Sequence, residues 1–228
     1  MNRPFVFVTM AMTADGKIAT ANRSISTFGS ARDHDHMLEL RATADAVMAG
    51  ARTVDAAAVN LGPGGAKYQR RRLKQGLAEY NIRIIVSGSG AIKPRAEIFK
   101  HRFSPIIILT TERVPAARLR QLRGLADEVW SGGGAEVDFP QALAWLRSRW
   151  HIRRLAGEGG AELNAALFRQ RLVDEIHLTI CPKIFGGRGA PTIAEGTGAP
   201  ILAEAAGFKI QSMRRVGDEL FAVFGSGQ

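Results

Sequence analysis

The chain has 228 residues, 46% of them hydrophobic and 23% charged, with a formal net charge of +10. Length and composition indicate an ordinary globular protein of one large or two small domains, and no run of about 18 apolar residues predicts a membrane span. A single cysteine, Cys181, excludes an intramolecular disulfide and fits a reducing cytoplasm, while five scattered histidines lack the spacing of a metal site.

Strands alternate with helices along the first half of the chain. Residues 5–11 alternate Val and Phe and read as a buried strand, not a signal peptide, because no long apolar region or cleavage site follows. Ser30 can cap a helix, and Asp33 completes an acidic capping-box pattern. In order, we predict a strand at 5–11, a turn at 13–17 continuing through 18–20, a loop at 21–29, a helix from 30 to about 42, a strand at 46–50, a short helix at 50–54, a flexible excursion at 60–76 and a strand at 82–86.

The second half continues the alternation and then closes with two strands. In order, we predict a strand at 105–110, a short helix at 114–122, a strand at 127–130, a helix at 139–150, a strand leading to a glycine-rich turn near 157, a helix after it, a strand at 174–182, a loop at 186–189 and an antiparallel pair at 208–215 and 220–224. This order predicts one α/β domain over residues 1–228. Its central sheet would be mostly parallel, with helices on both faces and an antiparallel C-terminal edge.

A glycine-rich turn lies between the predicted strand and helix at residues 154–168. Gly157, Gly159 and Gly160 fall within four positions. Glycines let the backbone approach a ligand closely, and a helix N-terminus favours negative charge, so a phosphate or pyrophosphate is the natural guest. The turn matches neither a dinucleotide fingerprint nor a P-loop, and a simple tight turn is the alternative. Glu158, inside the turn, is unexpected for a site that binds phosphate alone.

Two further strand ends carry similar features. Gly50, Arg52 and Thr53 form a second strand–glycine–helix junction, and Ser87–Gly90 end another strand with hydroxyls and mobile backbone. The carboxyl ends of parallel strands meet at one edge of a sheet, where ligands bind. We therefore expect all three turns to converge on a long cofactor with several phosphates.

The densest basic cluster is Lys67, Arg70–Arg72 and Lys74. A nucleic-acid site is one interpretation, but no zinc-finger, RRM or KH pattern accompanies the cluster. A solvated basic loop, or attraction of small polyanions, is the other interpretation. We expect a small-molecule partner and neither nucleic acid nor membrane.

Several stretches of the chain together match a known pattern: Met12–Thr20, Leu40–Ala42 with Gly50 and Thr53, Ile82–Gly88, Glu158–Gly160 with Leu163 and Asn164, Leu172–Glu175, and Pro182–Gly187. Through them the chain resembles, over nearly its whole length, the NADPH-dependent pyrimidine reductases of riboflavin biosynthesis, which have a dihydrofolate-reductase-like fold. The resemblance implies an oxidoreductase that opens the ribosyl ring of a diaminopyrimidine ribosylamino phosphate and reduces it to a ribityl chain with NADPH. It also implies a homodimer, and we expect a cytoplasmic enzyme.

The resemblance implies roles for individual residues. Arg41 and Glu158 match substrate-contacting positions, and Glu158 could bond the amino groups of a diaminopyrimidine. The proton donor has no named residue, and Arg23 or Arg52 could help Arg41 hold the substrate phosphate. The implied cofactor residues are Ala11 beside the nicotinamide, Gly50, Arg52 and Thr53, then Ser87, Gly88 and Ser89 at the adenosine end, and Gly159, Gly160 and Ala161 at the pyrophosphate.

Each singled-out side chain also has a structural interpretation. Arg41 can complement a helix dipole, and Glu158 can cap a backbone group. Asp15 is typical of a turn. His34 and His36 would be exposed helix residues, and Lys183 a solvated strand end.

The chain departs from the family at residues 54–61. The family carries Asp-Asp-Pro-x-Leu-Thr there, whereas this chain has Val-Asp-Ala-Ala-Ala-Val-Asn-Leu, with Asp55 as the remaining acid. Two alternatives therefore stay open. One is an NADPH-dependent dihydropterin reductase, with Asp33 or Asp35 on the first helix as its acid. The other is a non-catalytic nucleotide-binding module.

Overall fold

The computed structural model describes residues 2–23, 27–56 and 58–227. The chain divides into two compact units. The first unit comprises Met1–Phe5 and Leu38–Ala156, and the second comprises Val6–Met37 and Gly157–Gln228. We describe each unit separately.

The first unit is built on a sheet whose strands lie in the order β5-β4-β3-β2-β6. Strands β2 to β5 pair in parallel along the whole series. Ile106 to Leu109 of β4 are fully buried, as expected for a strand that is covered on both faces. The strands are β2 (Ala46–Gly50), β3 (Ile82–Val86), β4 (Ile106–Thr110), β5 (Glu128–Ser131) and β6 (Arg154–Gly157, in this unit to Ala156).

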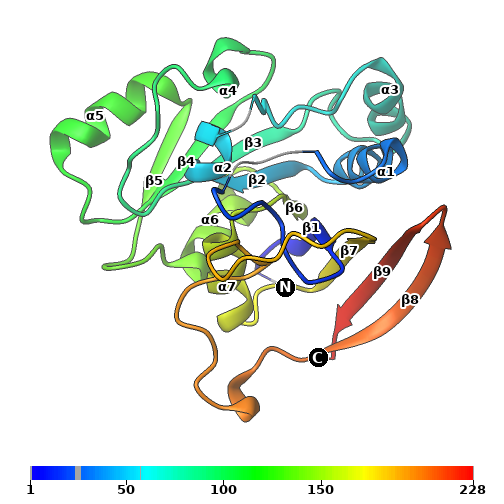
Figure 1. Cartoon of the computed structure of the whole chain (residues 1–228). Helices are drawn as coiled ribbons and strands as arrows, with labels where there is room; N and C mark the ends of the chain where they lie inside the picture. Colours follow the sequence, from blue (N-terminus) through cyan, green and yellow to red (C-terminus); the bar gives the residue numbers. More distant parts are fainter. Residues whose placement is uncertain (1, 24–26, 57, 228) are drawn as a thin grey trace. The chain divides into compact units, whose positions relative to one another are not determined.

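Among the residues that the structure describes, five helices belong wholly to the first unit, and Figure 1 shows α5 beside β4 and β5. Helix α6 begins where Asp138 accepts a hydrogen bond from the Gln141 amide, and its buried face is apolar. The helices are α2 (Ala51–Ala56), α3 (Ala66–Lys74), α4 (Glu97–Lys100), α5 (Ala116–Leu125) and α6 (Phe139–Arg149).

The basic run forms helix α3, so the prediction of a flexible excursion is wrong for residues 66–74. Tyr68 and Arg72 face inward, and Arg72 is only 1% exposed. Its guanidinium donates to the carbonyl oxygens of Ala44 (2.5 Å), Ala78 (2.8 Å) and Arg41 (3.2 Å). The helix therefore packs through one arginine, while its other basic side chains stay exposed.

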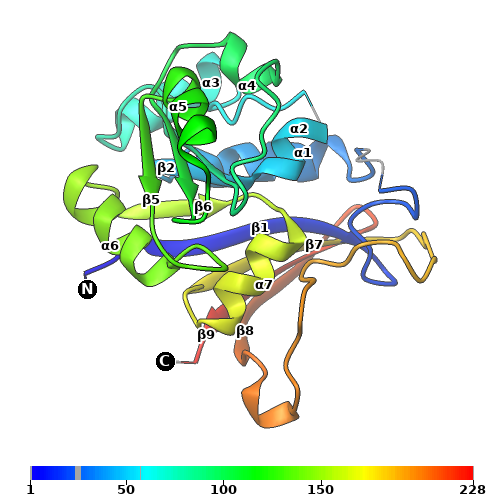
Figure 2. The same cartoon turned by 90° about the vertical axis from the view of Figure 1, so that its left-hand side faces the viewer.

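The second unit has strands in the order β1-β7-β9-β8. Strand β7 pairs parallel to β1 and antiparallel to β9, and β8 completes the antiparallel edge. Figure 2 shows α7 beside β1 and β7. The elements are β1 (Phe5–Thr13, from Val6 in this unit), α1 (Ala31–Arg41, to Met37 in this unit), α7 (Ala161–Arg169), β7 (Glu175–Cys181), the 3-10 helix η1 (Leu202–Glu204), β8 (Phe208–Val216) and β9 (Glu219–Ser226).

The predicted fold class is confirmed: strand pairing is mostly parallel, with an antiparallel C-terminal edge. Helices α4 and η1 were not predicted. In the part of the chain that the structure describes, no helix has both the length and the apolar character needed to cross a bilayer.

Replacing Arg72 with alanine should destabilise the first unit. The substitution removes the guanidinium donor of the buried Ala44 carbonyl and one of the two donors of the Arg41 carbonyl, and we expect a loss of about 3 kcal/mol. Arg71→Ala is the matched control, because Arg71 is its exposed neighbour and should cost less than about 0.5 kcal/mol. Urea denaturation measures both, and equal losses would contradict this role for Arg72.

Candidate functional site

In the first unit, two of the three predicted turns leave the sheet at the same edge. Gly50 at the end of β2 pairs with Val86 at the end of β3, so helix α2 and the turn at 87–90 begin side by side. Arg52 is exposed and Thr53 half-buried in the first turn of α2. The expected convergence is therefore observed for these two turns.

The turn after β3 is held rigid by threonine hydroxyls from β4 and the residue after it. Thr110 Oγ1 donates to the Ser87 carbonyl (2.6 Å), and Thr111 Oγ1 donates to the Gly88 carbonyl (2.7 Å). Gly90 has φ +68°, and a Cβ there would lie 2.8 Å from Val114, so glycine is required. The turn is thus a preformed surface and not a mobile one.

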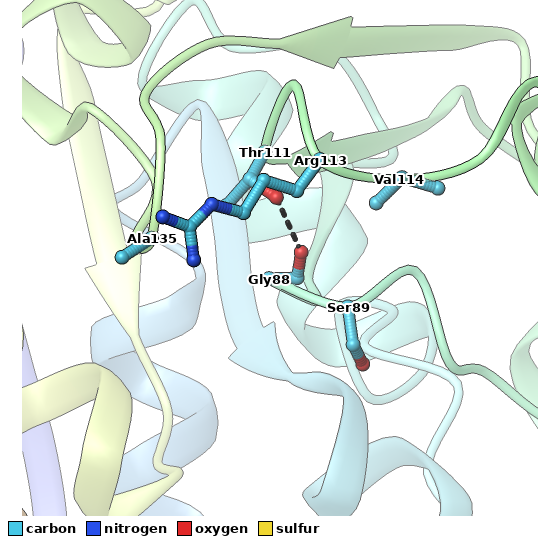
Figure 3. A pocket seen from close by; sticks show the side chains of 6 residues that line it. All are labelled: Gly88, Ser89, Thr111, Arg113, Val114 and Ala135. Atoms are coloured by element: carbon cyan, nitrogen blue, oxygen red, sulfur yellow. Dashed lines mark hydrogen bonds between the residues drawn. The ribbon is translucent and has the colours of Figure 1, made fainter.

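A pocket of about 310 Å³ opens beside this turn. Figure 3 shows the Arg113 side chain extending toward Ala135, with the Thr111–Gly88 hydrogen bond at the wall. Its lining residues are Gly88, Ser89, Thr111, Arg113, Val114 and Ala135. Gly88 and Ser89 were predicted from the sequence as binding residues, whereas Thr111 and Arg113 were not. The latter two follow strand β4, where no glycine indicates a ligand-binding turn.

The glycine-rich turn lies in the second unit, at the start of α7. Gly159 and Gly160 have φ +95° and +99°, which side chains other than glycine rarely adopt. A Cβ at Gly159 would also lie 3.4 Å from Met10 Sδ. Gly160 is the N-cap and provides no capping side chain, so the helix begins at Ala161 with a bare backbone. This geometry fits an anion such as a pyrophosphate. Glu158 is half-buried beside it.

Ala11 on β1 pairs with Thr179 on β7. An acidic cluster, made up of Asp33 and Glu219, lies near this residue pair. The Thr179 side chain is hydrogen-bonded to Asp33 in the first turn of α1. Glu219, at the start of β9, accepts hydrogen bonds from the Ser30 amide (2.7 Å) and hydroxyl (2.6 Å). Ser30 caps the helix as predicted, since its hydroxyl accepts from the Asp33 amide (3.2 Å). The second hydrogen bond of the predicted capping box, donated by the Ser30 amide, is accepted by Glu219 and not by Asp33.

Burial changes the acidity of two groups in this cluster. Desolvation raises the pKa of Asp33 above its ordinary value of 3.8, and the nearby negative charge of Glu219 raises it further, against the hydrogen bond from Thr179. Burial, with Glu219 alongside, raises the pKa of the Cys181 thiol to about 12. Cys181 is fully buried and therefore a poor nucleophile, whereas Asp33 is better suited to hold a proton.

Asp15 is a turn residue, as its structural interpretation proposed. Its carboxylate accepts from the Thr13 hydroxyl (2.5 Å) and from the amides of Phe185 (3.2 Å) and Gly186 (2.7 Å). The Thr13 hydrogen bond is the largest cause of its lowered pKa. Lys183 is not simply solvated, because its ammonium group donates to the Phe28 carbonyl (2.8 Å).

Several predicted cations and polar groups have protein partners. Arg41 is buried at the end of α1 and donates to the Gly62 carbonyl, while Arg23 pairs with Glu195 at 3.1 Å. Asp55 accepts from the Lys93 amide at 3.0 Å; of the altered segment 54–61, Ala57 lies outside the described residues.

The two histidines of α1 differ. His34 is exposed, as predicted, but His36 packs edge-on against Phe221 with ring centroids 5.2 Å apart, so that prediction is wrong. The pairing with β9 could not be seen in the helical pattern alone. Across residues 2–23, 27–56 and 58–227, no three His, Cys, Asp or Glu side chains are grouped to hold a metal ion.

Comparisons with known proteins place these features in a family. The model of the RibD C-terminal domain family matches residues 4–221. Proteins named 2,5-diamino-6-ribosylamino-4(3H)-pyrimidinone 5′-phosphate reductase from Archaeoglobus fulgidus and Methanothermobacter thermautotrophicus are each 32% identical to this chain. The first alignment covers 97% of both chains, and the second covers 97% of this chain and 98% of its relative.

A solved structure has the same fold. A pyrimidine reductase-like protein from Corynebacterium diphtheriae superposes with a TM-score of 0.78 at 20% identity. The match covers 100% of this chain and 93% of that protein. The resemblance drawn from the sequence motifs is thereby confirmed.

Replacing Asp33 with asparagine should stabilise the protein at neutral pH. Folding raises the pKa of this carboxyl, so at neutral pH, where it is charged in both the folded and the unfolded state, it lowers the free energy of unfolding. This cost is lost as the pH falls through the pKa of the folded state toward about 4, the pKa of an unfolded aspartate. We expect the melting temperature of Asp33→Asn to exceed the wild-type value by a few degrees at neutral pH, with the gain vanishing near pH 4. Asp218→Asn, at an exposed residue, is the control. A variant less stable than wild type at neutral pH would contradict the assignment.

Proposed function

The chain belongs to the family of RibD C-terminal domains, and we propose that it is a single-domain reductase of 2,5-diamino-6-ribosylamino-4(3H)-pyrimidinone 5′-phosphate, converting the ribosyl group to a ribityl group. The observation that carries the proposal is the alignment, over 97% of the chain, with two proteins named for this reaction. Both relatives are named as reductases, so this chain is an oxidoreductase, and a nicotinamide cofactor is the electron donor that we propose for it.

NADPH is the cofactor that we propose. Gly159, Gly160 and Ala161 would hold the pyrophosphate, since two residues with positive φ lead into an uncapped helix start. Ala11, on the strand next to β7, would border the nicotinamide. In the first unit, Ser87, Gly88 and Ser89 would hold the adenosine end, and Gly88 and Ser89 line the pocket. Gly50, Arg52 and Thr53 would also contact the cofactor.

The protein's own residues would position the substrate. When bound, the reduced nicotinamide supplies the hydride that reduces the ring-opened ribosyl group. Glu158 accepts hydrogen bonds from the pyrimidine amino groups, which explains a carboxylate beside an anion site. Arg41, tied to the Gly62 carbonyl, would contact the substrate phosphate, and Arg23 or Arg52 could help it.

A dihydropterin reductase is the second candidate, and one observation favours it. Proton transfer to a pterin ring is assisted by a positioned acid. Asp33 has a raised pKa and lies on the first turn of α1, hydrogen-bonded to Thr179. Direct comparison of the two substrates decides between the candidates.

We also propose that the enzyme is a cytoplasmic homodimer that does not bind nucleic acid. Strand β8 is exposed along most of its length, including Ile210 (64%) and Met213 (59%). Exposed edge strands that carry apolar side chains tend to pair with another chain. The buried role of Arg72 also removes one of the five basic residues from the cluster that suggested a nucleic-acid site.

The purified protein should oxidise NADPH when given the diaminopyrimidine phosphate and not when given dihydrofolate. Glu158→Gln should lower kcat/KM for the pyrimidine by about tenfold or more, because a charge-assisted hydrogen bond is lost, while NADPH affinity is unchanged. The absorbance of the reduced nicotinamide and fluorescence titration measure these quantities.

Glu204→Gln on η1 is the control, since it removes the same charge at an exposed site. NADPH oxidation with dihydrofolate alone would favour the second candidate. Binding of NADPH without turnover of either substrate would favour the non-catalytic module.

Changing Met213 to lysine should weaken the dimer. A charge in place of Met213, one of the exposed apolar side chains of β8, opposes pairing of two β8 strands. Light scattering after gel filtration should give a dimer mass for the wild type and a lower mass for Met213→Lys. A wild-type monomer at high concentration would refute the proposed assembly.

A further inference from the structure

Residues 60–65 form a loop that leads into helix α3, and side chains from two other parts of the first unit hold it in place. The Asn81 side chain, directly before β3, donates to the Leu61 carbonyl (2.8 Å). The Arg41 guanidinium, at the end of α1, donates to the next carbonyl, that of Gly62. The loop therefore joins a buried asparagine to the arginine that would contact the substrate phosphate.

Leu61 has a backbone conformation that leucine rarely adopts. Its φ is +55°, in the left-handed region, and the residue is only 2% exposed. A residue other than glycine keeps this conformation only where its surroundings hold it, and such residues cluster at functional sites. The burial of Leu61 and the hydrogen bond from Asn81 supply this constraint.

The position of the Gly62 carbonyl, which accepts from Arg41, is fixed by the packing around it. A Cβ at Gly62 would lie 2.6 Å from the Phe103 ring, so a larger residue would fit only if the ring moved. The Phe103 ring is covered in turn by the buried Arg83 guanidinium, 4.2 Å from the ring centroid. The Gly62 amide also donates to Asn60 Oδ1 (2.8 Å).

Asn81 is fully buried, and its side chain acts as a donor. Its Nδ2 donates to the carbonyl oxygens of Leu61 (2.8 Å) and Ile82 (3.1 Å). Among the residues that the structure describes, its Oδ1 has no hydrogen-bond partner. An unpaired buried acceptor lowers stability, so stability alone does not explain an asparagine at this position. The hold on Leu61 does explain it.

The Arg41 side chain is ordered from both ends. Arg41 is 7% exposed, and its own carbonyl oxygen accepts from the Arg72 guanidinium (3.2 Å). Its guanidinium is bonded to the Gly62 carbonyl at the other end. A cation whose direction is fixed in advance loses little side-chain entropy when it binds a phosphate, and therefore binds more tightly than a mobile one.

We propose that the loop at residues 60–65 positions the cation for the substrate phosphate, and that Asn81 is a positioning residue that acts through Arg41. The inference rests on the proposed function, in which Arg41 contacts this phosphate. Asn60 and Leu61 belong to the segment in which this chain departs from its family, so the family implies no such role for them.

The test uses ribose 5-phosphate and ribose as probes, which differ only in the phosphate. Isothermal titration should show that the wild-type protein binds ribose 5-phosphate more tightly than ribose. Asn81→Ala should weaken ribose 5-phosphate by about tenfold and leave ribose unchanged, because only the direction of the guanidinium is lost. In turnover, the same variant should raise KM for the diaminopyrimidine phosphate by about tenfold, with kcat and NADPH affinity unchanged.

A double-mutant cycle shows whether Asn81 acts through Arg41. Arg41→Met removes the charge and keeps an apolar chain of similar length, so it should weaken ribose 5-phosphate at least as much as Asn81→Ala. Adding Asn81→Ala to Arg41→Met should cause no further loss, because the side chain that Asn81 positions is already gone.

Two further variants separate positioning from a loss of stability. Asn60→Ala removes the acceptor of the Gly62 amide from a half-exposed side chain, so it disturbs the same loop with less effect on folding. It should weaken ribose 5-phosphate by about threefold. Leu122→Ala is the matched control, because Leu122 is buried on α5 of the same unit. It should lower the melting temperature and leave the preference for the phosphate unchanged.

Three results would overturn the proposal: equal weakening of both sugars by Asn81→Ala, an effect of Leu122→Ala as large, or losses by Asn81→Ala and Arg41→Met that add. If Asn81→Ala does not fold, an unchanged preference in Asn60→Ala overturns it. A wild-type protein that does not prefer ribose 5-phosphate would refute the proposal together with the phosphate contact of Arg41. A wild-type preference that Asn81→Ala abolishes, without turnover of the pyrimidine, would refute the proposed substrate alone.

Discussion

Parallel strands β2, β3 and β4 end at one level of their sheet, and the candidate site in the first unit depends on this register. Gly50 pairs with Val86, and Val86 pairs with Leu109. The chain segments that follow these three strands therefore leave the sheet at the same edge. Beyond that edge, their backbone N–H and C=O groups no longer pair within the sheet. Thr110 and Thr111 supply two of the missing donors by bonding the turn after β3. The pocket is thus positioned by hydrogen bonds that join the end of β4 to the turn after β3.

Buried polar groups organise the second unit in a comparable way. Glu219 joins the start of β9 to the start of α1 through Ser30, and Asp33 joins that helix to Thr179 on β7. Each carboxylate accepts hydrogen bonds from a different element, which makes the arrangement specific, and desolvation raises the pKa of Asp33. Ala11 lies opposite Thr179, so the same framework fixes the strand proposed to border the nicotinamide.

Features that repeat locally were predictable. The β-branched run of β3 and the hairpin of β8 and β9 follow from short-range patterns and were confirmed, as was the glycine turn that starts α7. Helix α3 was missed because its basic side chains suggested a solvated loop. Its inward face consists of Tyr68 and Arg72, and an arginine is not counted as a core residue in a hydrophobic pattern.

By itself, the sequence determined the order of the strands and of most helices, the glycine turn and the family, because these depend on neighbouring residues and on motifs that can be recognised in a single sequence. Only the tertiary structure decided which arginine of Arg70–Arg72 is buried, that Arg113 lines a pocket, and that Glu219 caps a helix 189 residues away. The physical reason is that burial and hydrogen bonding depend on the partner that folding brings near, and chemically equivalent side chains carry no local mark of that partner.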